Sequence, residues 1–129
     1  MIIDASALVA IICREPEEQA LVARMDENGP KLTHPASIYE AALAIARIRD
    51  VSVEVALTDL QDFVARAEIA VATIDEHMAA AAVLAFDRYG KGRHPAGLNM
   101  GDCFSYGCAK VRAMPLLYKG EDFAKTDLA

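Results

Sequence analysis

The chain has 129 residues, of which 54% are apolar, with a net charge of −6 and a sequence pI of about 5.0. This length and apolar content are typical of one folded domain and exclude a disordered chain. The acidic balance excludes a broad basic face for nucleic acid, because domains with such a face have a pI above about 9. A polyanionic substrate would therefore have to be met by a metal ion or by a local basic loop.

Signals for export or membrane insertion are not found in the sequence. No apolar run approaches the roughly 20 residues that span a bilayer. The opening residues 1–4 lack the basic segment and cleavage site of a secretory signal. The cysteines, Cys13, Cys103 and Cys108, are odd in number and have no CxxC spacing, so we expect buried thiols and neither a disulfide framework nor a zinc site. These features predict a cytoplasmic protein with no membrane partner.

Taken in chain order, short apolar segments alternate with helical patterns. We expect strands at residues 1–3, 31–34, 69–73 and 115–118. Helices are expected over residues 5–13, from Pro16, from Ser37 to about residue 49, from Ser52, from Asp75 to Gly90, and from Asn99. This alternation predicts a single α/β domain over residues 1–129, with a mainly parallel central sheet flanked by helices. We expect the tail from about residue 124 to be loosely ordered.

Two of the predicted helices begin with a capping pattern. The segment Ser37-Ile38-Tyr39-Glu40 has the form of a capping box, with Ser37 as the N-cap. In the late helix, Asn99 is expected as the N-cap, and Asp102 follows three residues later. Four residues of that helix recur at helical spacing and are predicted to face the core: Met100, Phe104, Cys108 and Val111.

Four carboxylates fall at comparable places relative to the predicted strands. Asp4 and Asp122 follow the first and fourth strands, while Glu40 lies in the first turn of the helix after the second strand and Asp102 in the first turn of the late helix. In an open parallel sheet, the residues just past the strand ends and in the first turns of the following helices share one rim, where ligands bind. We therefore predict that the four acids converge at this rim.

Convergence of four acids requires a counter-ion. Two carboxylates about 4 Å apart repel by roughly 4 kcal/mol at an effective dielectric constant near 20. A divalent cation removes this repulsion, and a set of oxygen ligands favours Mg²⁺ or Mn²⁺ over zinc. Such a cation can lower the pKa of a bound water and stabilise the oxygens of a phosphodiester during displacement.

Each acid also has an interpretation without catalysis. Asp4 can be a turn residue at a strand end, Glu40 can complete the capping box, and Asp102 can assist helix initiation. Asp122 can be the anion at the start of a last helical turn. From the residues alone both interpretations stay open.

Other chemistries fit less well. There is no GxGxxG after a strand, no GxxxxGK[ST] and no Gly-x-Ser-x-Gly. Asp4-Ala5-Ser6 lacks the second aspartate that is usual in aspartyl-phosphate enzymes. His34, His77 and His94 have no metal-ligand spacing, and His34 and His77 are interpreted as ordinary surface or rim residues.

In four segments the chain resembles a PIN-domain ribonuclease, specifically a VapC-type toxin of a bacterial type II toxin–antitoxin system. The segments are Ile3-Asp4-Ala5-Ser6-Ala7-Leu8, Ser37-Ile38-Tyr39-Glu40, Leu98-Asn99-Met100-Gly101-Asp102-Cys103 and Pro115-Leu116-Leu117-Tyr118-Lys119-Gly120-Glu121-Asp122-Phe123. They span nearly the whole chain in order and spacing.

The resemblance implies a Mg²⁺- or Mn²⁺-dependent endoribonuclease whose catalytic and metal-binding residues are Asp4, Glu40, Asp102 and Asp122. Asp4 and Asp102 are expected as metal ligands, and Glu40 as a ligand or as the residue that positions the attacking water. Glu121 is adjacent to Asp122 and could take its place. Ser6 and Asn99 match family positions near the site, where we expect them to orient ligands and water.

The resemblance also implies a homodimer and a cognate VapB-like antitoxin that wraps the toxin and places a basic side chain in the acidic site. We hypothesise that four residues guide RNA phosphates towards the rim: Lys91, Arg93, His94 and Lys119. The alternative is that this basic loop is only solvated and has no role in binding. Two other functions stay open: a non-catalytic protein-interaction module of the same fold, and a small-molecule phosphohydrolase.

Overall fold

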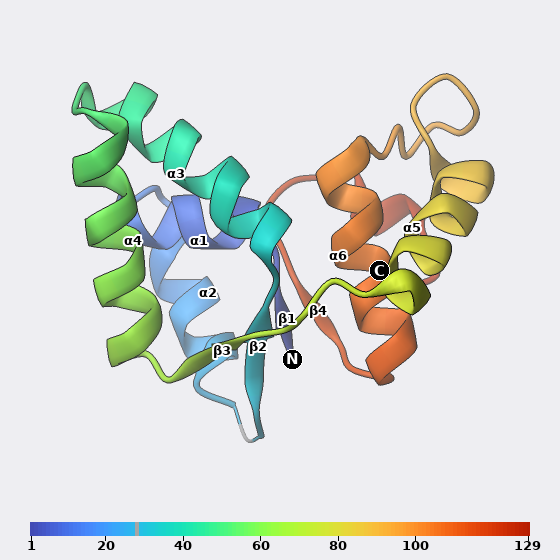
Figure 1. Cartoon of the computed structure of the whole chain (residues 1–129), viewed down its shortest axis with the longest axis horizontal. Helices are drawn as coiled ribbons and strands as arrows, with labels where there is room; N and C mark the ends of the chain where they lie inside the picture. The colour runs from blue at the N-terminus through green and yellow to red at the C-terminus, as the bar shows by residue number, and fades with distance from the viewer. Residues whose placement is uncertain (28) are drawn as a thin grey trace.

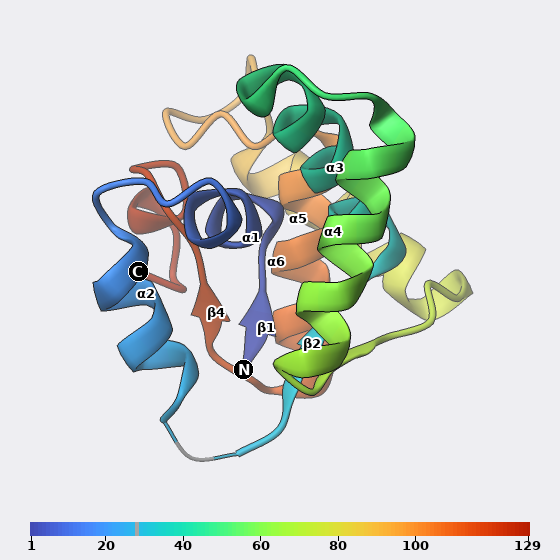
Figure 2. The ribbon, with the colours of Figure 1, turned by 90° about the vertical axis from the view of Figure 1, so that its left-hand side faces the viewer.

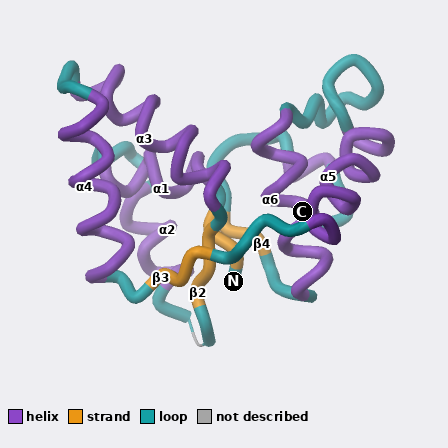
Figure 3. The backbone as a smooth tube through the Cα atoms, in the orientation of Figure 1, coloured by secondary structure: helices purple, strands orange, loops and turns teal. Residues whose placement is uncertain are grey.

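The computed structural model of the chain describes residues 1–27 and 29–129. Four short strands form one sheet in the order β3-β2-β1-β4. They are β1 (Ile2–Ile3), β2 (Lys31–Thr33), β3 (Ile69–Val71) and β4 (Leu116–Leu117). All three strand pairs are parallel, which confirms the predicted parallel sheet. Figures 1 and 3 show the strands at the centre of the molecule, between two groups of helices.

The helices connect the strands as the sequence predicts. They are α1 (Ala5–Ile12), α2 (Glu18–Met25), α3 (Pro35–Arg49), α4 (Val53–Arg66), α5 (Glu76–Tyr89) and α6 (Met100–Arg112), followed by a 3₁₀ helix, η1 (Phe123–Lys125). The α/β class is therefore confirmed. In the described part of the chain, no helix combines the length and the apolar character needed to cross a membrane.

The two faces of the sheet contact two separate cores. Successive side chains of a strand point to opposite faces. Ile3 and Leu117 belong to the core formed with α1, α2, α3 and α4, while Ile2 and Leu116 belong to the core formed with α5 and α6. Figure 2, viewed from the side of the first four helices, shows those helices in front of the sheet and α5 and α6 behind it. The domain therefore has three layers.

The start of α3 differs from the prediction. The helix begins at Pro35 and its N-cap is His34, whose Nδ1 accepts the Ser37 backbone N–H at 3.2 Å. The interpretation of Ser37 and Glu40 as a capping box is therefore wrong. Proline is favoured at the first helical position because it has no N–H to satisfy and its φ is already helical. Starting the helix three residues earlier moves Glu40 into the second turn, where it is not needed as a cap.

The other capping predictions are confirmed. Ser52 and Asp75 accept backbone N–H groups at the starts of α4 and α5. At the start of α6, Asn99 Oδ1 accepts the Asp102 N–H at 2.9 Å, and Asp102 Oδ2 accepts the Asn99 N–H at 3.1 Å. This is a complete capping box.

The predicted core stripe of α6 is correct for Phe104 and Cys108, which pack in the core, and wrong for Met100 and Val111. Met100 is 72% exposed and Val111 45% exposed, although Cys108 is fully buried. The buried side of the helix is instead rich in small residues: Gly101, Cys103, Ser105, Gly107, Cys108 and Ala109. A Cβ on Gly107 would lie 3.0 Å from the backbone nitrogen of Ala82 in α5. Small residues let the two helix backbones approach, and this contact determines which side of α6 faces inward.

The C-terminal segment, for which the sequence predicts loose order, contacts α6. Asp127 accepts hydrogen bonds from the Tyr106 hydroxyl at 2.7 Å and from Lys110 Nζ at 2.8 Å. Of the three free cysteines, Cys103 and Cys108 are buried as predicted, whereas Cys13 is partly exposed.

Candidate active site

The strand order determines where a ligand can bind. From β1 the chain proceeds to β2 and β3 on one side of the sheet and returns as β4 on the other side of β1. In such sheets the binding crevice lies beyond the carboxyl ends of the strands, where the order reverses. A cavity of about 330 Å³ opens there. The residues that line it are Asp4, Ala5, Ser6, Val9, Glu15, Glu40, Ala44, Arg47, Ile48, Asn99, Asp102 and Lys119.

Three of the four predicted acids, Asp4, Glu40 and Asp102, line this one cavity. They come from the N-cap of α1, the second turn of α3 and the first turn of α6. Asp122 is exposed at the start of η1 and does not line the cavity, although its charge contributes to raising the pKa of Asp102.

Asp4 is held by three hydrogen bonds and is only 2% exposed. Its Oδ2 accepts the Ser6 backbone N–H at 2.9 Å and the Ser6 hydroxyl at 2.6 Å. Its Oδ1 accepts the Ser105 hydroxyl at 2.5 Å. Because bonds to a carboxylate are stronger than bonds between neutral groups, the orientation of Asp4 is well determined.

Glu40 reaches towards α6 because residue 101 has no side chain. A Cβ on Gly101 would overlap the Glu40 carboxylate, so the glycine provides the space that this group occupies. Burial raises the pKa of Glu40, and the charge of Asp4 raises it further. Both effects favour a protonated Glu40 while no cation is present.

Asp102 has both a structural role and a place in the cavity. It completes the capping box of α6 and also lines the cavity. Burial raises the pKa of Asp102 to about 7, against the effect of its hydrogen bond from Asn99, and the charges of Asp4, Glu40 and Asp122 add to the rise. Burial is thus the main cause of the shift, and the neighbouring carboxylates increase it.

Ser6 and Asn99 lie where the sequence predicts orienting groups. The Ser6 hydroxyl donates to Asp4 and accepts the Lys119 backbone N–H at 3.0 Å, so it joins the segment after β1 to the segment after β4. Asn99 lines the cavity and is bonded to Asp102.

Of the four predicted RNA-guiding residues, only Lys119 lines the cavity. Its ammonium group is paired with Glu15 and lies 3.5 Å from Glu17. Lys91, Arg93 and His94 lie in the loop between α5 and α6 and do not line the cavity. Arg93 pairs with Asp87 at 3.1 Å, and His94 Nδ1 accepts the Ala96 N–H at 3.0 Å.

Two charged residues of the cavity, Arg47 and Glu15, were missed from the sequence. Arg47 is exposed on the face of α3 that carries Glu40, two turns further along. Within residues 1–27 and 29–129, no carboxylate lies within salt-bridge distance of Arg47. The spacing of residues 40, 44, 47 and 48 on one helix face is the signal that could have identified it.

The interpretation of His34 as a surface or rim residue is wrong. Its side chain is fully buried between α3 and α6, and Nε2 lies 2.9 Å from Ser105 Oγ and 3.1 Å from Ser37 Oγ. The short strand β2 ends immediately before it, so His34 enters the interior at the same edge of the sheet as Asp4. His77, in contrast, is exposed in the first turn of α5, as expected.

The chemistry of the donors fits a divalent cation. Asp4, Glu40 and Asp102 offer carboxylate oxygens, which Mg²⁺ and Mn²⁺ prefer, and their mutual repulsion is the kind that a cation relieves. The space at Gly101 directs Glu40 into the cluster. Among the residues that the structure describes, however, no group of three or more acidic, histidine or cysteine side chains is already arranged to bind a metal ion. The three carboxylates are suitable ligands and line the same cavity. Their side chains would have to move closer together to bind a cation.

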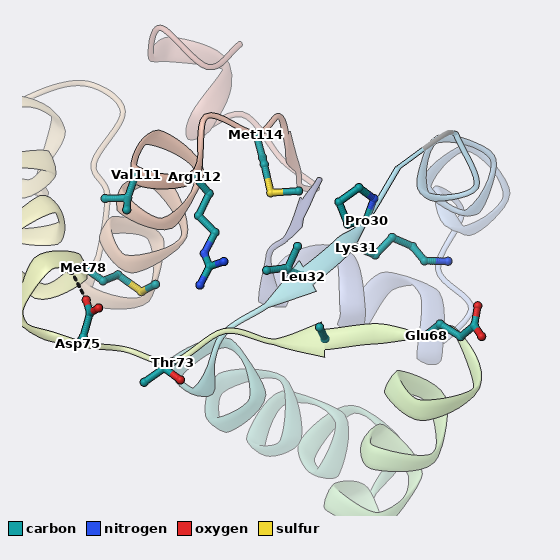
Figure 4. Close-up of a pocket in the computed structure, with 11 residues that line it drawn as sticks. Pro30, Lys31, Leu32, Glu68, Thr73, Asp75, Met78, Val111, Arg112 and Met114 are labelled. Atoms are coloured by element: carbon teal, nitrogen blue, oxygen red, sulfur yellow. Dashed lines mark hydrogen bonds between the residues drawn. The ribbon is translucent and has the colours of Figure 1, made fainter.

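A larger cavity, of about 820 Å³, extends along β2 and β3, between the start of α5 and the end of α6 (Figure 4). Lys31, at the start of β2, and Met114, just before β4, are among the residues that line it. It contains none of the predicted site residues, and its charges are mixed: Lys31 and Arg112 against Glu68 and Asp75. The smaller acidic cavity is therefore the candidate site, because it has both the position and the chemistry.

Comparison with known proteins agrees with this fold. A family model described as PIN domain matches residues 1–128. A ribonuclease VapC of Mycolicibacterium smegmatis is 45% identical over 129 residues, which cover 100% of this chain and 98% of that protein. Ribonuclease VapC30 of Mycobacterium tuberculosis is 45% identical over 130 residues, covering 100% of this chain and 96% of its own.

One similar solved structure is that of Mycobacterium tuberculosis VapC20, described as a sarcin–ricin loop cleaving toxin. The two structures have a TM-score of 0.71 over 95% of this chain and 92% of that one, with 13% sequence identity. At this identity the similarity shows a common fold.

Proposed function

Because the chain belongs to the PIN-domain family, we propose that it is an endoribonuclease that cleaves RNA phosphodiester bonds at the Asp4–Glu40–Asp102 cavity with the help of Mg²⁺ or Mn²⁺. The observation that carries this proposal is the shared cavity itself: three carboxylates from three elements lie at the switch point of the sheet, and burial and mutual repulsion raise the pKa of Asp102 to about 7. The ribonuclease names of the relatives support the RNA substrate.

Asp4 and Asp102 would hold the cation, with Glu40 as a third ligand or as the residue that positions the attacking water. Asp122 lies near enough to act on Asp102 electrostatically and is the fourth acid of the proposal. When bound, the cation would lower the pKa of water and neutralise charge that develops on the phosphodiester oxygens.

The protein's own residues contribute fixed geometry and charge. Asp4 is held in place by Ser6 and Ser105, so it costs little reorganisation on binding. Glu40, which the space at Gly101 directs towards α6 beside Asp102, can orient the attacking water once a bound cation favours its ionised form. Arg47, which is free of carboxylate partners in the described structure, can meet a phosphate of the RNA strand.

Two partners belong to the same proposal. A cognate antitoxin would inhibit the enzyme by inserting a cationic side chain among the carboxylates, which relieves the same repulsion as a metal ion. We also propose a homodimer, which sedimentation equilibrium of the purified chain would test: a mass near 13.9 kDa would contradict it.

The direct test is RNA cleavage by the purified chain with Mg²⁺, with Mn²⁺ and with chelator, in parallel with a small phosphodiester such as bis(4-nitrophenyl) phosphate. Cleavage of RNA that requires metal supports the proposal. Turnover of the small ester without RNA cleavage would favour a phosphohydrolase. Failure with both substrates, together with failure to bind Mn²⁺ in calorimetry, would favour a non-catalytic interaction module.

A further inference from the structure

A chain of buried hydrogen bonds reaches Asp4 from the start of α3. His34 and Ser105 are fully buried and Ser37 is 1% exposed. His34 lies 2.9 Å from Ser105, and Ser105 lies 2.5 Å from Asp4. In the described part of the chain no buried side-chain nitrogen or oxygen lacks a hydrogen-bond partner, so this network is fully satisfied. Such networks in a low-dielectric interior hold their members rigidly.

Two hydrogen bonds of this network have a fixed direction. The Ser37 backbone N–H can only donate, so His34 Nδ1 is an acceptor and the neutral ring carries its proton on Nε2. Burial lowers the pKa of His34, which favours this neutral form. A carboxylate oxygen can only accept, so the Ser105 hydroxyl donates to Asp4 Oδ1. The His34 Nε2–H can then donate to the Ser105 oxygen at 2.9 Å, with the Ser37 hydroxyl oxygen, at 3.1 Å, as the other acceptor within reach.

This direction has a consequence for the Asp4 carboxylate. A carboxylate has about four acceptor positions. Ser6 fills two of them on Oδ2, and Ser105 fills one on Oδ1. One acceptor position remains on Oδ1. The protein bonds therefore select the oxygen atom that is available to a further partner.

The network also joins the three elements that carry the acids. His34 caps α3, which carries Glu40. Ser105 lies in α6, one turn after Asp102. Asp4 caps α1. A single hydrogen-bonded path of buried side chains therefore joins all three elements.

We propose that His34, acting through Ser105, is a positioning residue that orients the Asp4 carboxylate and leaves one acceptor position on Oδ1 for the divalent cation. This inference rests on the proposed function, because it assumes that Asp4 binds the cation. The competing explanation is that His34 serves only as the cap of α3.

Two substitutions separate positioning from capping. Asparagine is among the best N-cap residues, so His34→Asn keeps an acceptor for the Ser37 N–H, but its short side chain removes the donor to Ser105. Ser105→Ala removes the donor to Asp4 directly. Thr33→Val is the matched control, since it removes a fully buried hydroxyl that donates to the Ile3 carbonyl at 2.9 Å and does not touch Asp4.

The experiment is calorimetric titration of each chain with Mn²⁺ alone, together with thermal denaturation of the metal-free proteins. Loss of a group that orients a metal ligand lowers metal affinity by about 10- to 100-fold. We expect this loss for His34→Asn and Ser105→Ala at retained folding, and none for Thr33→Val. If His34→Asn and Ser105→Ala both bind Mn²⁺ as tightly as the wild type, the positioning role of His34 is overturned and the proposed metal site still stands. A wild-type chain that binds no Mn²⁺ would overturn the proposed metal site and the inference with it.

A measurement on the metal-free wild type keeps the inference testable if a variant does not fold. The ¹⁵N chemical shifts of the His34 ring distinguish the two neutral tautomers. A proton on Nε2 and none on Nδ1 would support a hydrogen bond donated by His34 to Ser105. A proton on Nδ1 would contradict it, because Ser105 could then receive no hydrogen from His34.

Discussion

The Glu40 carboxylate occupies the space in which a side chain on Gly101 would begin. Glu40 on α3 and Gly101 in the first turn of α6 are 61 positions apart in the sequence, and the absence of a side chain on Gly101 leaves room for Glu40. Gly101 does not adopt a left-handed conformation, so its backbone conformation alone does not require glycine there. What requires glycine is the close approach of the glutamate to α6, directly beside Asp102.

Gly101→Ala should therefore reduce activity without unfolding the protein. The new methyl group meets the flexible end of Glu40, which can swing away, and alanine favours a helix over glycine by roughly 1 kcal/mol. We expect RNA cleavage to fall by about 10- to 100-fold, since a displacement of about 1 Å at a reacting group can cost this much. Initial cleavage rates and the melting temperature measure the two effects.

Gly107→Ala is the control for this substitution. Its Cβ would lie 3.0–3.2 Å from backbone and side-chain atoms of Ala81 and Ala82 in α5, which cannot swing away. We expect a lower melting temperature with cleavage retained per folded molecule. If Gly101→Ala instead destabilised the protein and left its cleavage intact, the role assigned to the space at residue 101 would be wrong.

Asp102→Asn should stabilise the metal-free protein, and more so at high pH. Asp102 has a pKa of about 7 in the folded protein, above its value of 3.8 in the unfolded chain. The folded state therefore binds more protons between these values, and stability falls as the pH rises from about 4 to about 7. Asparagine is neutral throughout and retains a capping oxygen, so it avoids this loss.

Melting temperatures in the presence of chelator, at pH 5 and pH 8, test this prediction. We expect Asp102→Asn to exceed the wild type by a few degrees at pH 8 and by less at pH 5. Asp75→Asn changes an acidic helix-capping residue that lies outside the acidic cavity, at the N-cap of α5, and should show no such trend. A large loss of stability in Asp102→Asn at both pH values would mean that the helix cap is the main role of Asp102.

Arg47→Ala should weaken the binding of RNA. Arg47 lines the acidic cavity and is not neutralised by a carboxylate in the described structure, so it can contact a phosphate. Removing one phosphate contact should reduce the slope of log affinity against log salt by about one. The affinity of the catalytically inactive Asp102→Asn chain for RNA, with and without Arg47→Ala, can be measured at several salt concentrations.

The loop residues Lys91 and Arg93 provide the comparison for Arg47. If they guide RNA, the double substitution to alanine reduces both cleavage and the salt slope. If the loop is merely solvated, the double variant behaves as the wild type while Arg47→Ala does not. An unchanged slope in Arg47→Ala would show that this arginine makes no phosphate contact.

Much of the fold could be predicted because local signals agree with tertiary packing. Ser52, Asp75 and Asn99 are strong N-caps and begin helices where expected. His34 is a weaker signal, since an imidazole is seldom counted as a capping group. Its role depends on Ser37 and Ser105, the second of which is 71 positions away.

The grouping of Asp4, Glu40 and Asp102 could be predicted from the edge that the carboxyl ends of parallel strands share. The helical turn that carries Glu40 and the buried face of α6 could not. Glu40 was placed in the first turn of α3 and lies in the second, because Pro35 begins the helix earlier. The apolar spacing on α6 identified Phe104 and Cys108 but not the rest of the inner face, where Gly107 and other small residues allow close contact with α5. Arg47 was missed because its place in the cavity depends on the direction of α3.

The measurement that most directly tests the central claim is cleavage of RNA by the wild type, by Asp102→Asn and by Glu15→Gln, each with Mn²⁺ and with chelator. Glu15 lines the same cavity but lies outside the proposed metal set, so Glu15→Gln controls for the loss of one negative charge. We predict cleavage that requires Mn²⁺, is retained in Glu15→Gln, and is reduced more than about 100-fold in Asp102→Asn, beyond the loss expected for an outer partner of a metal ligand. Cleavage that persists in Asp102→Asn, or that does not respond to chelator, would contradict a metal-dependent site at these carboxylates.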